Sequence, residues 1–418
     1  MFELLHPFHD RAETLLALGQ AATALSLLAW LYLLFLHGRF WKADQRLPPW
    51  RADRPPPITD WPRVVAVVPA RNEADVIGAA VGALLALDYP GGVPVVLVDD
   101  GSTDGTADAA RAAAATLGAQ AAARLVVLTG AARPPGWAGK VWAMAQGIAE
   151  AERLHPAATH LLLTDADIAH DPANLRELAV KAMGGGPDGR RHVLVSLMVM
   201  LKADGFWERL LIPAFVYFFQ QLYPFPWVND PARRIAAAAG GCMLVERRAL
   251  AAAGGMAAIR DRIIDDCALA GRLKPQGPIW LGLTPLTVSL RGYGGLAGVW
   301  HMVARSAYTQ LRHSPWLLAG TMVGMLLLYA APPAAAVAGW WRQELLLQML
   351  GIGSWLAMVW TMRPTLRLYG RPAPIGLALP LAGLLYALMT LSSAVAHWRG
   401  RGGAWKGRVA GRRDEHPA

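Results

Sequence analysis

The sequence predicts an α/β domain with a mostly parallel sheet, combined with one N-terminal and about three C-terminal transmembrane helices. Three observations lead to this prediction. The 418-residue chain is 54% hydrophobic and only 17% charged, which excludes a disordered chain and is high for a purely soluble protein. Four uncharged stretches are long enough to cross a bilayer. Between the first and second of them, short apolar runs alternate with alanine-rich helical segments, a pattern typical of βα units.

The first uncharged stretch, residues 15–36, is too long and too rich in Trp and Tyr for a signal-peptide core. We therefore expect residues 1–40 to form a retained transmembrane anchor. Basic residues after this stretch outnumber those before it. By the positive-inside rule the middle of the chain is then cytoplasmic.

The C-terminal transmembrane region is expected over residues 316–398. It holds three uncharged stretches, at residues 316–341, 345–362 and 375–396. Pro332-Pro333 is expected to kink or break the first, and the second is short enough for either a span or a re-entrant segment. The sequence leaves open on which side the C-terminus lies. The remaining parts are an interfacial segment at 301–315 and a basic tail at 399–418.

The middle region, residues 60–300, is expected to be one cytoplasmic domain. Because its apolar runs are continuous rather than alternating, the strands are predicted to be buried on both faces, under helices. Ligands of such sheets bind at the carboxyl ends of the strands. Strands are expected at 64–68, 95–98, 125–128, 161–163 and 193–197, with helices at 75–87 and from about residue 106.

Polar and acidic side chains follow three of these strands. Asp165 and Asp167 come directly after the fourth strand, and such a pair suits Mg²⁺ or Mn²⁺ that also holds a diphosphate. Helix capping or a solvated loop is the alternative interpretation. Asp99 and Asp100 follow the second strand; they are suited to accept hydrogen bonds from a base and a ribose, or they simply form a turn.

Two further segments contain candidate catalytic or binding residues. Asp265 and Asp266 open a short amphipathic helix, where a carboxylate either serves as a general base or only stabilises the helix dipole. Lys140 follows Gly139 at another helix start, from which it would reach a phosphate or remain a surface lysine. No dinucleotide-binding glycine motif follows the first strand and no P-loop motif occurs.

Charge and cysteine content narrow the possibilities further. The net charge is +10. In so apolar a chain, an excess of basic residues more often lies on the cytoplasmic side of a membrane than in a nucleic-acid site. We find no basic stripe with groove-reading elements, so no nucleic-acid partner is expected. Cys242 and Cys267 match neither a disulfide framework nor a zinc spacing.

In their order and spacing, these motifs resemble those of family 2 glycosyltransferases with a GT-A fold. The resemblance covers roughly residues 64–310. With the membrane helices added, the chain looks most like the hopanoid-associated, ceramide-glucosyltransferase-like branch. The matching segments are 67–73, 98–106, 139–140, 164–167, 240–242 with Arg247-Arg248, and 265–266 leading into Leu269 and Arg272-Leu273.

The resemblance implies a role for each matching residue. Asp266 would be the catalytic base, with Asp265 beside it. Asp167 would bind the divalent metal, Mg²⁺ or Mn²⁺, with Asp165 contacting the ribose or a metal-bound water. The residues expected to bind the nucleotide-sugar are Pro69, Arg71, Glu73, Asp99, Asp100, Lys140, Asp165 and Arg305.

One family motif is missing. Processive and ceramide-type members carry Q-x-x-R-W before the C-terminal spans, where this chain has His301 and Arg305. Either residue is a candidate for binding diphosphate in its place. The absence of this motif disfavours a processive polysaccharide synthase.

The expected function is inverting, metal-dependent transfer of a sugar from a nucleotide-sugar, expected to be UDP-linked, to a membrane lipid. A hopanoid-type or ceramide-like hydroxyl is the expected acceptor. A polyprenyl-phosphate glycosyltransferase is an alternative, whose phosphate acceptor needs no general base. A non-catalytic membrane protein that binds nucleotide-sugar is another. A haloacid-dehalogenase-like phosphatase is disfavoured, because its nucleophilic Asp belongs near the first strand.

Overall fold

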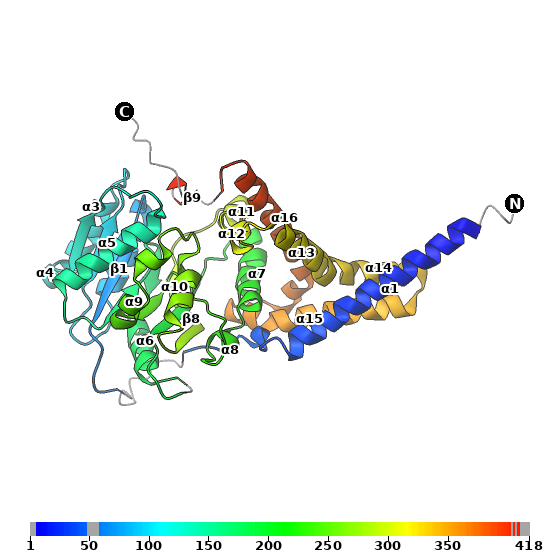
Figure 1. The fold of residues 1–418 in the computed structure, drawn as a ribbon, viewed down its shortest axis with the longest axis horizontal. Coiled ribbons are helices and arrows are strands. Elements are labelled where there is room, and N and C mark those ends of the chain that lie inside the picture. Colours follow the sequence, from blue (N-terminus) through cyan, green and yellow to red (C-terminus); the bar gives the residue numbers. More distant parts are fainter. Residues whose placement is uncertain (1–5, 48–57, 187, 403, 406–407, 410–418) are drawn as a thin grey trace. The chain divides into compact units, whose positions relative to one another are not determined.

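The computed structural model describes residues 6–47, 58–186, 188–402, 404–405 and 408–409. The chain forms two compact units. The sheet unit comprises residues 44–204, 225–293 and 398–418, and the apolar helix unit comprises 1–43, 205–224 and 294–397. Both are drawn in Figure 1.

Within the described residues, the sheet unit has one eight-stranded sheet in the order β3-β2-β1-β4-β7-β6-β8-β5. Strands β3, β2, β1 and β4 are parallel neighbours, and β6 is parallel to β8. Strand β7 runs antiparallel to β4 and β6, and β5 antiparallel to β8. The predicted α/β fold with a mostly parallel sheet is confirmed. The strands are β1 (Val64–Ala70), β2 (Val95–Asp99), β3 (Leu125–Thr129), β4 (His160–Leu163), β5 (Ile168–His170), β6 (Leu194–Met200), β7 (Met243–Glu246) and β8 (Ile279–Ser289).

Helices cover both faces of this sheet, as the continuous apolar strands predict. Alternate residues of β1, such as Val64, Ala66 and Val68, belong to one core cluster with residues of α2, α3 and α6. The side chains between them face α5, because strand side chains alternate. The helices of the sheet unit are α2 (Ala74–Leu85), α3 (Thr106–Thr116), α4 (Ala119–Ala122), α5 (Gly139–Leu154), α6 (Asn174–Met183), α8 (Phe225–Val228), α9 (Arg247–Ala252), η2 (Met256–Ile259) and α10 (Asp265–Leu273). Strands β9 (Ala404–Trp405) and β10 (Arg408–Val409) pair antiparallel in a separate two-stranded sheet.

The apolar helix unit contains four helices long and apolar enough to cross a membrane, within the described part of the chain. They are Glu13–Phe35, Pro315–Arg342, Leu345–Leu368 and Ala373–Trp398. The predicted arrangement of one N-terminal and three C-terminal helices is confirmed, and the stretch expected as a span or a re-entrant segment lies in a continuous helix. The elements are α1 (His6–Phe35), η1 (Phe40–Lys42), α7 (Phe206–Leu222), α11 (Leu296–Ala304), α12 (Ala307–Gln310), α13 (Pro315–Met325), η3 (Leu326–Ala330), α14 (Ala331–Arg342), α15 (Leu345–Leu368), η4 (Ala373–Ala378) and α16 (Leu379–Trp398).

The stretch that holds Pro332-Pro333, expected to be kinked or broken, is not broken: it lies within one helix, Pro315–Arg342. A π-helical turn, η3, directly precedes α14, and such a turn accommodates the backbone hydrogen bond that proline cannot make. After α14, Gln343 takes a left-handed conformation with φ of 56°, and α15 turns back along α14. Gly339 and Gly351 allow the close approach, because a Cβ at either would lie 2.4 Å from backbone of the facing helix.

Helix α7 lies in the apolar helix unit, whereas the sequence analysis placed residues 206–222 inside the domain at 60–300. The Tyr217 hydroxyl is 2.8 Å from Thr361 Oγ1, and Gln220 Nε2 donates to Thr365 Oγ1 at 3.3 Å. These buried hydrogen bonds tie α7 to α15, and they are why its apolar run joins the long helices. Much of the expected basic tail, including Lys406, Arg412 and Arg413, lies outside the described residues.

Helix α5 approaches the sheet closely at Gly147, and this contact is testable. A Cβ at residue 147 would lie 2.5 Å from Val67 Cγ1 and 2.9 Å from Val98 Cγ2. We expect Gly147→Ala to destabilise the protein by roughly 1–3 kcal/mol through overpacking. Gly82→Ala in α2 is the matched control, because a Cβ there meets nothing within 4 Å, and alanine is the better helix former. The midpoint of thermal unfolding in detergent should fall for the first variant only; equal midpoints would contradict the packing argument.

Candidate active site

Three predicted strand ends meet at one edge of the sheet, because β1, β2 and β4 are parallel neighbours. Ala70 pairs with Asp99, and Val67 pairs with Leu163. The backbone N–H of Asp100 also donates to the carbonyl of Ala70 at 2.9 Å. The segments after these strands therefore begin side by side, as the sequence analysis expected.

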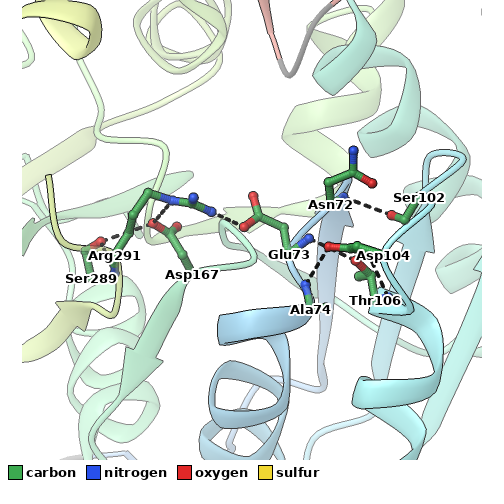
Figure 2. Close-up of polar contacts among 9 residues, drawn as sticks. All are labelled: Asn72, Glu73, Ala74, Ser102, Asp104, Thr106, Asp167, Ser289 and Arg291. Carbon is green, nitrogen blue, oxygen red and sulfur yellow. Dashed lines mark hydrogen bonds and ion pairs between the residues drawn. The ribbon is translucent and has the colours of Figure 1, made fainter. Parts of the chain in front are cut away.

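The loops after β1 and β2 hold each other in place (Figure 2). The N–H of Glu73 donates to Thr106 Oγ1 at 2.8 Å, and the N–H of Ala74 donates to Asp104 Oδ2 at 3.0 Å. Asp104 thereby caps the first turn of α2, and its Oδ1 accepts from the N–H of Thr106 at 3.1 Å. Asn72 bends the first loop with φ of 51°. Both loops are ordered by their own side chains.

The expected nucleotide-binding residues in these loops are placed as follows. Pro69 is buried within β1. Arg71 Nη1 donates to the carbonyl of Asp100, while the Arg71 Nε is buried and has no hydrogen-bond partner within the described residues. Asp99 Oδ1 accepts from the N–H of Ser102 at 2.9 Å, which closes the turn. Asp100 is only 2% exposed, so Asp99 is the more accessible of the two acids.

Lys140 joins two acidic motifs that are far apart in the sequence. Its Nζ lies 2.8 Å from Asp165 Oδ1 and 3.3 Å from Asp265 Oδ2. Burial disfavours the ammonium, but the charges of Asp165 and Asp265 outweigh it and raise the pKa of Lys140 above its ordinary value. Lys140 is therefore a permanent cation between the D-x-D motif and the start of α10.

Asp266 is held by backbone groups. Its Oδ2 accepts from the N–H of Gly240 at 2.9 Å and its Oδ1 from the N–H of Cys267 at 2.7 Å. Burial and the neighbouring charge of Asp265 raise the pKa of Asp266 to about 6, although Lys140 and the two N–H groups oppose them. A Cβ at Gly240 would lie 3.1 Å from Lys140 Nζ, so a larger residue there would push the lysine side chain away.

Asp167 lies in a second polar cluster, shown in Figure 2. Its Oδ2 accepts from Ser289 Oγ at 3.1 Å and lies 3.5 Å from Arg291 Nε. Arg291 Nη2 also donates to Glu73 Oε2. Burial and the charge of Asp165 raise the pKa of Asp167, whereas Arg291 and Ser289 lower it. The cluster connects the D-x-D motif to the loop after β1.

Sequence reasoning missed Ser289 and Arg291, which stand at the end of β8 and just after it. The strand Ile279–Ser289 was not predicted because Gly282 and Pro285 interrupt its apolar run. One signal was present: an arginine followed by Gly-Tyr-Gly-Gly directly after an apolar segment. Glycine-rich segments after a strand often approach ligands closely.

A buried network fixes the strand end that carries the D-x-D motif. Thr164 Oγ1 donates to the carbonyl of Gly241 at 2.7 Å and lies 3.0 Å from His170 Nε2. Burial lowers the pKa of His170 to about 4, so the imidazole is neutral. Asn174 Nδ2 lies 3.0 Å from His170 Nδ1, which assigns the proton to Nε2 and makes Nε2 the donor to Thr164. The network locks the glycine pair of residues 240–241 against β4.

The structure thus brings together the expected site residues of the sheet unit. Asp165, Asp265 and Asp266 converge around Lys140, while Asp167 and Glu73 share Arg291. Arg305 belongs to the apolar helix unit, as the residue that caps the end of α11, and its predicted role stays a prediction.

The described residues include no group of three or more His, Cys, Asp or Glu side chains that could hold a metal ion. Asp167, with Asp165 two positions before it, instead offers hard oxygen ligands from one short segment. Such a donor set fits a Mg²⁺ or Mn²⁺ ion that takes its remaining ligands from water and a bound diphosphate.

Comparison with solved structures bears on the fold. The chain is similar to the mannosyltransferase PcManGT from Pyrobaculum calidifontis, solved with GDP-Man and Mn²⁺, with a TM-score of 0.51 and 20% identity over 91% of this chain and 99% of that one. It also matches residues 1–349 of TarS from S. aureus, solved with UDP-GlcNAc, with a TM-score of 0.39 and 14% identity over 85% of this chain and 98% of that one.

No curated protein sequence matches the chain. The family model described as glycosyltransferase like family 2, however, matches residues 62–279, more than half of the chain. This range contains the D-x-D motif, Lys140 and the acidic pair at the start of α10. The chain therefore belongs to glycosyltransferase family 2, and it is a glycosyltransferase built on the GT-A fold.

Proposed function

We propose that the protein transfers a sugar from a nucleotide-sugar to a hydroxyl of a membrane lipid, with inversion at the sugar carbon and with a divalent metal. One observation carries this proposal: Lys140 contacts both Asp165 of the D-x-D motif and Asp265 of α10. The residues proposed to bind the departing diphosphate and the residue proposed to take the acceptor proton therefore lie within one cluster.

Asp266 is the proposed general base, and Asp265 acts beside it through Lys140. Asp266 is only partly buried, and its raised pKa lies near working pH, as suits a group that accepts a proton from a hydroxyl. The N–H groups of Gly240 and Cys267 orient its carboxylate before the acceptor arrives. Asp265 instead makes the ion pair with Lys140, which makes it the less suitable base.

The loops after β1 and β2 are the proposed donor site. The buried Nε of Arg71, which has no hydrogen-bond partner among the described residues, is a donor that a phosphate or base oxygen of the nucleotide would satisfy. Asp99 is the proposed acceptor for a base or ribose group, with Pro69, Glu73 and Asp100 shaping the same loops. Lys140 and Asp165 would face the diphosphate and ribose. We propose a UDP-sugar; PcManGT was solved with GDP-Man, so GDP-sugars belong in the first test.

Asp167 is the proposed metal ligand, with Asp165 as the second carboxylate of the motif. A bound Mg²⁺ or Mn²⁺ would neutralise the negative charge that develops on the departing diphosphate. The Ser289 hydroxyl orients Asp167 Oδ2. Burial and the charge of Asp165 raise the pKa of Asp167. A negative charge here is therefore costly unless a cation such as the proposed metal compensates it.

The apolar helix unit supports a lipid as the acceptor. Its four helices are of membrane-spanning length, and Phe206 at the start of α7 and Trp316 at the start of α13 are 74% and 86% exposed. Aromatic side chains in such positions suit the membrane interface. We propose a hopanoid-type or ceramide-like hydroxyl, reached from the cytoplasmic face of a bacterial inner membrane, with Arg305 as a further diphosphate contact.

The first test is the reaction itself. Purified protein in detergent, incubated with a panel of UDP- and GDP-sugars, total bacterial membrane lipid and Mn²⁺ or Mg²⁺, should yield a lipid that has gained one sugar by mass spectrometry. A metal chelator should abolish the product, because the diphosphate would leave without its counter-charge. Donor hydrolysis with no lipid product from any membrane extract would contradict a lipid acceptor.

Asp266→Asn should lower kcat by about 10²–10⁴-fold, because the amide cannot accept the hydroxyl proton. Asp261→Asn is the matched control: Asp261 lies nearby in the sequence, but it is exposed, and its ion-pair partner Arg262 is its neighbour in the chain. An Asp266→Asn enzyme with full activity would favour a phosphate acceptor, such as a polyprenyl phosphate, over a hydroxyl.

The pH dependence tests the same assignment. Because Asp266 works as a carboxylate and its pKa is about 6, kcat/KM should rise as pH increases through about 6 and then level off. Lys140→Met removes a nearby positive charge, so it should raise the pKa of Asp266 and move this rise to higher pH. A rise at unchanged pH in the Lys140→Met enzyme would show that another group controls it.

A further inference from the structure

Within the part of the chain that the structure describes, two cations contact the D-x-D motif, and they differ in how firmly they are held. Lys140 pairs with Asp165, and its side chain is 18% exposed; Arg291 pairs with Asp167, and its side chain is 42% exposed. Each cation has a second carboxylate partner, Asp265 for Lys140 and Glu73 for Arg291. The start of the helix that carries Lys140 is also anchored, because the N–H of Ala138 donates to the carbonyl of Arg260 at 2.6 Å. Arg291 is more exposed and lies outside any helix or strand, so it is the cation that can move.

Arg291 approaches the same carboxylate that the proposed metal requires. Its Nε lies 3.5 Å from Asp167 Oδ2, the oxygen that also accepts from Ser289. A divalent ion on this carboxylate and a guanidinium at this distance would repel each other strongly in a partly buried site. The two cations therefore compete for Asp167.

The backbone after Arg291 is rich in glycine, which allows the arginine to move away from Asp167. Gly292, Gly294 and Gly295 follow within four residues; the last two have φ of 64° and 98°, and added Cβ atoms at all three would meet nothing within 4 Å. On the other side, Glu73 anchors the far end of the guanidinium, as Figure 2 shows. Glu73 lies on the loop proposed to bind the donor, so Arg291 stays beside the donor site when it leaves Asp167.

We propose that Arg291 is an exchangeable counter-ion of Asp167 that becomes a ligand of the donor's diphosphate. Without metal it neutralises Asp167. When the divalent ion takes the carboxylate, the guanidinium turns to the diphosphate oxygens, which it suits by charge and by its planar array of donors. This inference rests on the proposed function, because it takes Asp167 as the metal ligand.

The test measures Mn²⁺ binding without nucleotide, using the electron paramagnetic resonance signal of free Mn²⁺ and the full-length protein in detergent. Arg291→Gln should bind Mn²⁺ roughly two- to fivefold more tightly than the wild type, which is the effect of removing a partly exposed competing charge. Arg291→Lys keeps the charge and should stay close to the wild type. Arg111→Gln, which removes an exposed arginine from its pair with Asp108, is the surface control.

The second measurement is UDP and GDP affinity at saturating Mn²⁺, by calorimetry. Here Arg291→Gln should weaken binding of whichever nucleotide the wild type prefers by about tenfold or more, as expected for a lost charge-assisted hydrogen bond. Tighter metal binding together with weaker nucleotide binding is a pair of opposite effects that simple loss of folding cannot produce. Thermal unfolding checks that each variant is folded.

Unchanged or weaker Mn²⁺ binding by Arg291→Gln would overturn the counter-ion exchange. Unchanged nucleotide affinity would overturn the contact with diphosphate. Asp167→Asn separates these outcomes from failure of the proposed function: if it binds Mn²⁺ as well as the wild type does, the metal assignment itself is wrong. If Asp167→Asn loses Mn²⁺ while Arg291→Gln changes nothing, only the inference about Arg291 fails.

Discussion

The site depends on how its negative charge is compensated. Five carboxylates lie in the two clusters around Lys140 and Arg291, and in the described residues these two cations pair with four of them. Lys140 is the more buried cation, and it draws together carboxylates separated by about a hundred positions in the sequence. Without it, Asp165 and Asp265 would repel each other, and the start of α10 would lose its ion pair with the segment after β4. The excess of negative charge that remains suits a site that works with a divalent cation. The carboxylates are Glu73, Asp165, Asp167, Asp265 and Asp266.

Much of this arrangement was predictable from the sequence, because parallel strands bring their carboxyl ends to the same edge. The runs at 64–68, 95–98 and 161–163 were apolar enough to be identified as strands, and each was followed by polar residues. Their convergence then required no knowledge of long-range contacts. The long uncharged stretches were equally clear, since bilayer thickness sets a minimum helix length.

Other features depend on contacts that no local pattern encodes. Gly282 and Pro285 interrupt the apolar pattern of β8, so the sequence does not predict this strand. Ser289 and Arg291, at its end, are not predicted as site residues for the same reason. The apolar run of α7 lies among residues expected to form the cytoplasmic domain, and long-range contacts, such as the hydrogen bonds of Tyr217 to Thr361 and of Tyr386 to the carbonyl of Leu211, place it with the long helices. The ion pairs of Lys140 could not be foreseen, because a lysine after glycines predicts a phosphate contact as readily as a carboxylate contact.

Strand β7 is antiparallel to both of its neighbours, β4 and β6, and this constrains the length of the segment that precedes it. Because β7 begins where β4 ends, with Leu163 opposite Met243, the amide of Gly240 that holds Asp266 lies a fixed three residues before the first paired position. Adding or removing one residue there would turn every later side chain of β7 to the opposite face or withdraw that amide from the carboxylate. The number of residues between Gly240 and Met243 is therefore constrained more strictly than their identity. Homologous chains should show substitutions in this segment before they show insertions or deletions.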